Sequence, residues 1–281
     1  MRLVDSHCHL QAARFDADVE QVIDAARTAG VERILVPGWN GWSSAAALAL
    51  VDRFPWLDAA VGVHPHDAAA VDDEAWRAIA AMALDHRVVA IGETGLDYDR
   101  GFSPVLDQLA NLRRNLQLAA ATGKPAILHC RSRAGARDAQ DALLGELRAF
   151  GSEPPPIVIH SFSGPLDYAE SMLELGATIS VSGLAFRSGE EATAEVVRLV
   201  PWDRLLVETD SPFLSPPGAP RGRNAPEWVR LTAAWVAEQR GDAIDDAGVS
   251  LVAAYDRAFR GQAAPARPPT GITRRHDRAR G

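Results

Sequence analysis

The chain has 281 residues, a formal net charge of −8 and two cysteines, a length that suits one large domain or two small ones. With 47% hydrophobic and 23% charged residues it has the composition of a globular protein, which excludes global disorder. The acidic balance argues against a passive nucleic-acid coat, but not against a nucleic-acid enzyme whose metals supply positive charge.

Short apolar runs alternate with longer stretches of helical spacing. The expected strands, in chain order, are Leu3–Asp5, Arg33–Val36, Leu57–Val63, Val88–Ile91, Ala126–Leu128, Ile157–Ile159, Ala177–Val181 and Leu205–Val207. These runs are almost continuously apolar, which is typical of parallel strands buried on both faces. Eight such βα units predict an α/β protein with a single-domain (β/α)8 TIM barrel. The rival architecture is a doubly wound open sheet, but no G-x-G-x-x-G motif follows the first expected strand of this sequence.

Extra helices are expected after the eighth strand. A loop rich in Pro and Gly, Ser211–Pro226, precedes a helix with Trp228 and Trp235 on one face, and a last helical stretch ends near Phe259. We therefore expect the barrel with its C-terminal helices to occupy residues 1–260. Residues 261–281 contain almost no large apolar side chains and are expected to form a disordered tail.

The sequence contains no membrane signal. No run approaches the roughly 18 uninterrupted apolar residues of a membrane span, and Asp5 and His7 interrupt the N-terminus before a signal-peptide core could form. We expect a cytoplasmic protein, in which both thiols stay reduced.

Polar residues at the carboxyl ends of the expected strands carry the chemical information. They are His7, His9, His64, Glu93, His129, His160 and Asp210. In a βα barrel these ends meet at one rim, where such enzymes place their sites. Imidazole and carboxylate groups suit first-row divalent cations. Because a carboxylate can bridge two cations and a neutral imidazole cannot, Glu93 is the candidate bridge.

The two cysteines lie beside candidate ligands but are expected to face away from them. In an extended strand alternate side chains point the same way, so His7 and His9 face together and Cys8 faces oppositely. The same rule separates Cys130 from His129. We therefore interpret both cysteines as packing residues, and a mixed Cys/His zinc site is the less favoured hypothesis.

In their local strings these residues resemble the TatD family of metal-dependent hydrolases, a branch of the amidohydrolase superfamily. The matching strings are DSHCHL at 5–10, VGVHPHDA at 61–68, IGETGLDY at 91–98, HCR at 129–131, HSFSG at 160–164 and ETDSPFLSP at 208–216. The resemblance covers residues 1 to about 260.

This resemblance implies a (β/α)8 barrel with two divalent metal cations (Zn, Mn or Mg) and a DNase-like phosphodiesterase activity, often 3′→5′ exonucleolytic on single strands. Carried onto this chain, it implies one metal held by His7, His9, Glu93 and Asp210, and a second held by Glu93, His129 and His160. The implied partner is nucleic acid as substrate, above all single-stranded DNA, with no membrane and no obligate protein partner.

The corresponding hypothesis is metal-assisted hydrolysis with Asp210, Glu93 and His64 as catalytic residues. Asp210 acts as a ligand and as general base toward a water that bridges the metals. His64 either contacts the substrate phosphate or assists proton transfer, or it is a buried histidine that satisfies a backbone group. Glu208 lies two residues before Asp210, so its side chain is expected to point the same way. We expect Glu208 to support the site rather than to act in catalysis.

Substrate contacts are expected from Arg131, which faces the rim with His129, and from Arg223 and Asn224 in the loop after the eighth strand. The alternatives are a surface salt bridge for Arg131 and a solvated loop arginine for Arg223. Phe162 and Phe213 follow strand-end ligands and either stack on bases or pack.

Three positions depart from the family pattern, and alternatives to a nuclease stay open. Cys130 stands where the family usually has Ser, Asn115 where it often has Gln, and Ala225 where it tends to have Glu. The same metal site could hydrolyse an ester or amide, as in a D-aminoacyl-tRNA deacylase, or the barrel could be a non-catalytic relic. Lactonases and cyclic amidases commonly bridge their metals through a carbamylated lysine at the carboxyl end of a strand. Lys124 instead precedes the fifth strand, at its amino end, which argues against these two activities.

Overall fold

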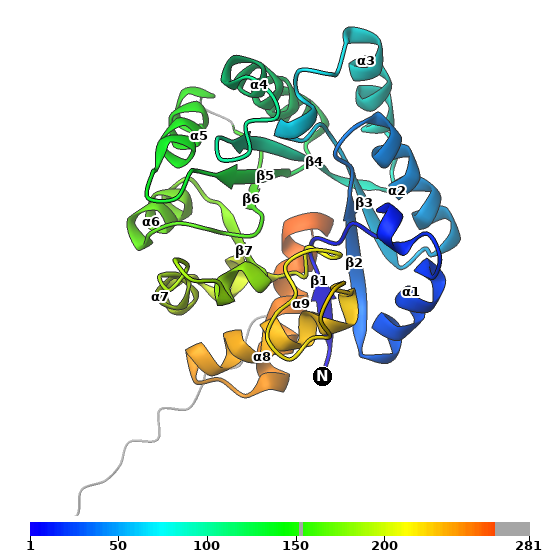
Figure 1. The fold of residues 1–281 in the computed structure, drawn as a ribbon, viewed down its shortest axis with the longest axis vertical. Helices are drawn as coiled ribbons and strands as arrows, with labels where there is room; N and C mark the ends of the chain where they lie inside the picture. The colour runs from blue at the N-terminus through cyan, green and yellow to red at the C-terminus, as the bar shows by residue number, and fades with distance from the viewer. Residues whose placement is uncertain (152–153, 262–281) are drawn as a thin grey trace, which may run out of the picture.

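The eight strands pair in parallel, and their spatial order follows their order in the chain (Figure 1). The computed structural model describes residues 1–151 and 154–261. Its strands are β1 (Leu3–Asp5), β2 (Val31–Pro37), β3 (Leu57–Val61), β4 (Val88–Asp97), β5 (Ala126–Arg131), β6 (Ile157–Ile159), β7 (Thr178–Val181) and β8 (Leu205–Val207). Most of their residues are buried, because helices cover the outer face and side chains fill the barrel.

Helices connect successive strands and form the outer layer of the molecule (Figure 1). They are α1 (Val19–Thr28), α2 (Gly41–Arg53), α3 (Asp73–Met82), α4 (Val105–Thr122), α5 (Asp138–Ala149), α6 (Leu166–Glu174) and α7 (Thr193–Leu199), followed after β8 by α8 (Val229–Arg240) and α9 (Ile244–Arg260). Among the described residues, no helix has the length and apolar character that a membrane crossing requires.

Backbone contacts between the first and last strands bring the sheet back on itself. The Ser6 N–H donates to the Val207 carbonyl at 3.1 Å, and the Asp210 N–H donates to the His7 carbonyl at 2.9 Å. An isolated parallel bridge at Cys8 extends this pairing. The predicted (β/α)8 barrel is thereby confirmed as a nearly closed ring, and the open-sheet alternative is excluded.

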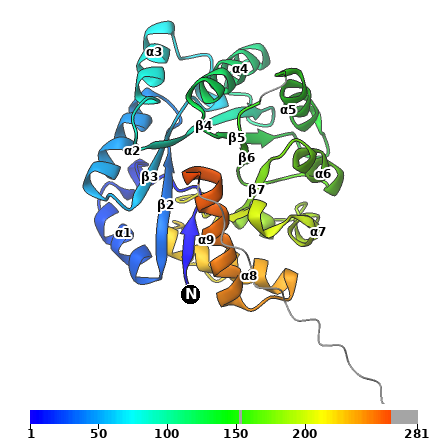
Figure 2. The ribbon, with the colours of Figure 1, turned by 180° about the vertical axis from the view of Figure 1, so that it is seen from behind.

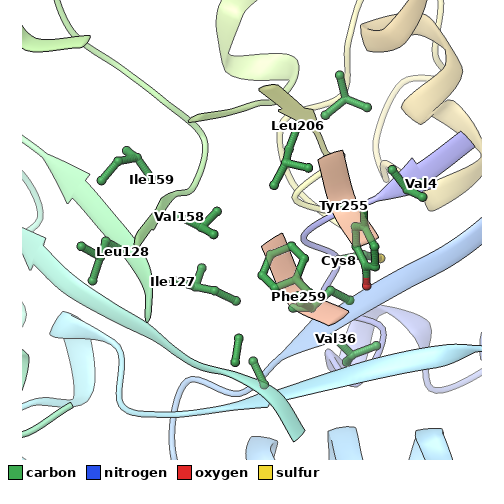
Figure 3. Packing of buried hydrophobic residues seen from close by; sticks show 14 of the residues in the cluster. Val4, Cys8, Val36, Ile127, Leu128, Val158, Ile159, Leu206, Tyr255 and Phe259 are labelled. Atoms are coloured by element: carbon green, nitrogen blue, oxygen red, sulfur yellow. The ribbon is translucent and has the colours of Figure 1, made fainter. Parts of the chain in front are cut away.

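One end of the barrel is covered by α9, which lies along β1 (Figure 2). Its Tyr255 and Phe259 join one apolar cluster with side chains from several strands (Figure 3). The Tyr255 hydroxyl and the Arg260 guanidinium donate to Asp58, each at 2.9 Å. Since Asp58 is the second residue of β3, α9 is attached at the amino end of the barrel, opposite the strand ends that carry the predicted site.

The predicted lengths of two strands were wrong. The expected end of β4 at Ile91 falls short, because its pairing with β5 shifts register between Ile91 and Thr94 and then continues to Asp97. β5 correspondingly runs to Arg131. The other strand ends differ from the prediction by at most two residues. Of the expected tail, residues 262–281 lie outside the described residues.

Gly95 allows this extended pairing, because its backbone approaches β5 too closely for a side chain. At φ +137°, a Cβ at Gly95 would lie 2.0 Å from the carbonyl oxygen of His129. A glycine that resembles a strand breaker in the sequence is therefore what permits β4 to continue.

We expect Gly95→Ala to lower the free energy of unfolding by about 2–4 kcal/mol, since overpacking adds to left-handed strain. Gly101→Ala is the matched control: its φ is also positive, at +61°, but no atom lies within 4 Å of an added Cβ. The control should cost about 1 kcal/mol. Denaturant unfolding of both variants is the measurement, and equal losses would contradict the close-approach explanation.

Candidate metal centre

The polar side chains predicted at the strand ends meet around one buried carboxylate, that of Glu93. Only 3% of this side chain is exposed. It follows Gly92 in β4 across a cis peptide bond. Its two oxygens face different groups of side chains, so the site has two sides.

The Oε2 side of Glu93 faces the histidine pair of the first strand and Asp210. His7 Nε2 lies 3.2 Å and His9 Nε2 lies 3.6 Å from this oxygen. Asp210 Oδ1 lies 3.3 Å from His9 Nε2 and 3.9 Å from His7 Nε2. The predicted common direction of His7 and His9 is confirmed, since their Nε2 atoms are 3.3 Å apart.

The Oε1 side faces three further imidazoles. His129 Nδ1 lies 3.0 Å, His160 Nε2 3.2 Å and His64 Nε2 3.3 Å from this oxygen. These rings come from β5 and from the segments that follow β6 and β3. All six residues that the resemblance names as ligands thus lie within one cluster, and His64 joins them.

His64 satisfies a backbone group, which was one of the two expected uses, and it also faces the site. Its Nδ1 accepts the backbone N–H of His66 at 3.1 Å, while its Nε2 faces Glu93. Burial lowers the pKa of His64 to about 4 despite the opposing charge of Glu93, so the ring is neutral at pH 7. A neutral imidazole whose Nδ1 accepts a hydrogen bond carries its proton on Nε2. His64 therefore presents a donor to the site.

The negative charge of the site is compensated by imidazoles. Glu93, Asp97, Glu208 and Asp210 lie in or directly behind it, and within the described residues their ion-pair partners are all histidines. Burial acts to raise the pKa of Glu93, but the surrounding imidazoles outweigh burial and bring it well below its usual range. Conversely, burial acts to lower the pKa of His160, and the Glu208 and Glu93 carboxylates raise it well above its usual range.

Divalent cations fit this donor set. Three groups of three side chains each have ligand atoms within 4.8 Å of one another: His7, His9 and Glu93; His64, Glu93 and His129; and His7, His160 and Asp210. Nitrogen and carboxylate oxygen donors at this density are the usual ligands of first-row divalent ions, whose charge would replace protons on the imidazoles.

Asp97 is a site residue that sequence reasoning missed. Its Oδ2 lies 2.7 Å from His66 Nε2 and 3.4 Å from His129 Nε2. The backbone N–H groups of Asp99 and Arg100 donate to its other oxygen at 3.0 and 2.8 Å. The sequence could have indicated this residue, because Asp97 lies four residues after Glu93 and alternate side chains of a strand point the same way. The carboxylate orients the His129 ring from behind.

Glu208 and Asp5 support the site from behind. Glu208 Oε1 lies 2.7 Å from His160 Nδ1, in agreement with the expected supporting role, and its other oxygen accepts from Ser180 Oγ at 2.6 Å. Asp5 accepts from the Thr209 hydroxyl at 2.5 Å and from the Thr209 N–H at 2.9 Å. Burial raises the pKa of Asp5 to about 8. This pairing holds the backbone on which Asp210 is carried.

The residues expected to contact substrate are used differently. Arg131 forms an exposed ion pair with Asp99 at 2.8 Å. Arg223 makes two 2.7 Å contacts to Asp18 and is only partly exposed. The expectation for Asn224 is corrected: its fully buried amide donates to the Thr209 carbonyl at 2.9 Å, so it holds the later part of this loop against the segment that directly follows β8.

Parity and packing settle the remaining candidates. Cys8 and Cys130 are buried in the apolar cluster, as predicted. Asn115 is buried on α4 and bonds to Asn111, which is a structural use. Phe162 is buried and stacks on Tyr168, which is the packing alternative rather than base stacking.

Comparison with known proteins agrees with this geometry. A family model of TatD-related DNases matches residues 4–260. The chain is 34% identical over 236 residues to the Bacillus subtilis protein YabD, an uncharacterized metal-dependent hydrolase, covering 84% of this chain and 90% of that protein. It is 35% identical over 246 residues to a Klebsiella pneumoniae protein named 3′-5′ ssDNA/RNA exonuclease TatD, covering 85% of this chain and 91% of that one.

Solved structures agree as well. The crystal structure of YJJV, a TatD homologue from Escherichia coli, superposes with a TM-score of 0.82 at 31% identity, covering 92% of this chain and 98% of that one. A TatD-family hydrolase from Entamoeba histolytica shares the fold, with a TM-score of 0.81 at 19% identity. Because the family match spans nearly the whole barrel and relatives exceed 30% identity, this chain belongs to the TatD-related DNase family and is a TatD-type metal-dependent hydrolase.

Proposed function

We propose that this protein is a nuclease that removes nucleotides from the 3′ end of single-stranded DNA by hydrolysing phosphodiester bonds. The observation that carries the proposal is the two-sided environment of Glu93, with imidazoles at both of its oxygens and Asp210 beside His9 on the Oε2 side. The names of relatives about 35% identical, 3′-5′ ssDNA/RNA exonuclease, support the substrate class and the polarity.

Two divalent cations are the proposed cofactors. His7, His9, Asp210 and Glu93 Oε2 would hold one, and His129, His160 and Glu93 Oε1 the other. When bound, such ions neutralise charge on a phosphoryl group and lower the pKa of coordinated water. Lys124 donates to the Ala83 and Asp85 carbonyls, which supports a carboxylate bridge over a carbamylated lysine.

Asp210 is the proposed general base. Its side chain is 14% exposed, against 3% for Glu93, so it is the carboxylate more accessible to an attacking water. Burial acts to raise the pKa of Asp210, but the hydrogen bond from His9 and the nearby His160 lower it below its usual value. The group is therefore ionised at neutral pH and able to accept a proton.

His64 and Arg131 are the proposed phosphate contacts. The Nε2 proton of His64 can be donated to a phosphate oxygen without any change of tautomer. Arg131 is paired with Asp99 in solvent, where an ion pair contributes little, so a phosphate can compete for its guanidinium.

Asp210→Asn should keep the fold and lower kcat by about a hundredfold or more, as the loss of a general base does. Single-turnover kinetics on a labelled oligonucleotide measure this, with circular dichroism and metal content as checks on folding and loading. Full turnover in a metal-loaded variant would refute the assigned role.

Glu93→Gln should reduce the metal bound after reconstitution from two equivalents per chain to one or fewer, because the amide cannot supply two anionic oxygens. Metal analysis by mass spectrometry provides the readout, independent of activity. Glu32→Gln is the control, since Glu32 pairs with Arg2 on the surface. Unchanged stoichiometry in Glu93→Gln would exclude Glu93 as the bridge.

A substrate panel tests the function directly. The metal-loaded protein is incubated with end-labelled single-stranded DNA, duplex DNA, RNA, a D-aminoacyl-tRNA and a set of lactones. We expect progressive shortening of single-stranded DNA from its 3′ end and slower attack on the duplex. Cleavage confined to the aminoacyl ester or the lactones would overturn the nuclease proposal.

A further inference from the structure

Exposed aromatic rings stand beside the candidate metal centre. Trp42, in the first turn of α2, is 64% exposed, and Phe213, in the loop after β8, is 50% exposed. Trp39 lies partly buried between Trp42 and the site. We call these three residues the aromatic rim.

The rings of the rim connect directly to a proposed ligand. The Phe213 and Trp39 rings meet the His9 ring edge-on, with centroids 6.1 and 5.2 Å away, and Trp42 follows Trp39 at 6.0 Å. Thus the two exposed rings reach the centre from separate segments, one at the start of α2 and one in the loop after β8. Each lies one or two ring contacts from His9.

The loops that carry the rim are held by hydrogen bonds. Ser43 Oγ accepts the Trp39 N–H at 2.8 Å, and the Trp39 carbonyl accepts the His64 N–H at 2.9 Å. The Phe213 N–H donates to the Asp210 carbonyl at 2.9 Å. The rings are therefore positioned by the backbone segments that also carry His64 and Asp210.

Large apolar rings exposed at the edge of a polar site indicate a binding surface. We propose that Trp42 and Phe213 stack on the bases that flank the scissile phosphate, an inference that rests on the proposed nuclease function and assigns its strand preference to these two residues. Bases in a duplex stack on one another, whereas bases of a single strand are free to stack on protein rings.

The charge of the protein agrees with a stacking surface. A chain with 29 basic and 37 acidic residues has no net positive charge to attract a phosphate backbone, and Arg223, in the same loop as Phe213, is already paired with Asp18. We therefore expect base stacking to contribute a larger share of the binding affinity for single-stranded DNA here than it does in a nuclease with a net positive charge. It is also tolerant of sequence, because every base has a ring face.

The test compares two single-stranded oligonucleotides, one with normal bases and one with abasic residues at its three 3′-terminal positions. The measured quantity is kcat/KM for the oligonucleotide with normal bases divided by kcat/KM for the abasic one. We expect this ratio to fall about tenfold in Trp42→Ala and in Phe213→Ala, and further in the double variant. Trp42→Tyr, which keeps an aromatic ring at this position, should retain most of the wild-type ratio.

Leu84→Ala is the matched control, since Leu84 is 77% exposed but lies in the turn before β4, at the opposite end of the barrel, and should not alter the ratio. Equal losses on both oligonucleotides would overturn the inference, because the rings would then act by positioning His9. If the wild-type protein cleaves the strand and both alanine variants leave the ratio unchanged, the stacking role is refuted while the nuclease proposal stands. If the wild-type protein is inactive on every nucleic acid, the proposed nuclease function itself is refuted.

Discussion

The burial of one ionised carboxylate, Glu93, is the constraint on which the rest of the structure depends. Removing a carboxylate from water is costly unless opposite charge or hydrogen-bond donors replace the solvent. Here five histidines surround it, on β5 and on the segments after β1, β3 and β6. The histidines come from four different strands and the segments that follow them, so the carboxylate is compensated only when these strands lie side by side in the barrel.

A second layer of acidic groups keeps these histidines in place. Asp97 fixes His129 and Glu208 fixes His160, each through the ring nitrogen that faces away from Glu93. Asp5 acts one step further back, since it holds the backbone beside Asp210. Acidic partners behind ligand histidines orient the rings and increase their basicity. The concentration of carboxylates thus serves geometry as well as charge.

The two ends of the barrel divide stability from chemistry. At the amino end, α9 is anchored on Asp58 and closes the core. At the carboxyl end, the strand ends and the segments that follow them carry the candidate ligands and the aromatic rim. Loops on a rigid scaffold can present exposed rings such as Trp42 and Phe213, because the helices and strands beneath them supply the stability.

The sequence by itself determined the barrel, the gathering of the polar strand-end residues around Glu93 and the packing of both cysteines in the apolar cluster. These follow from local periodicity and from the position of each polar residue at a strand end, which barrel symmetry converts into proximity. Only the tertiary structure decided the tautomer of His64, the place of Asp97 behind His129, and the internal use of Arg223 and Asn224. Each of these depends on a partner whose approach is set by loop conformation or strand register. Arg223, for example, meets Asp18 across 205 residues of chain, a contact that no local pattern encodes.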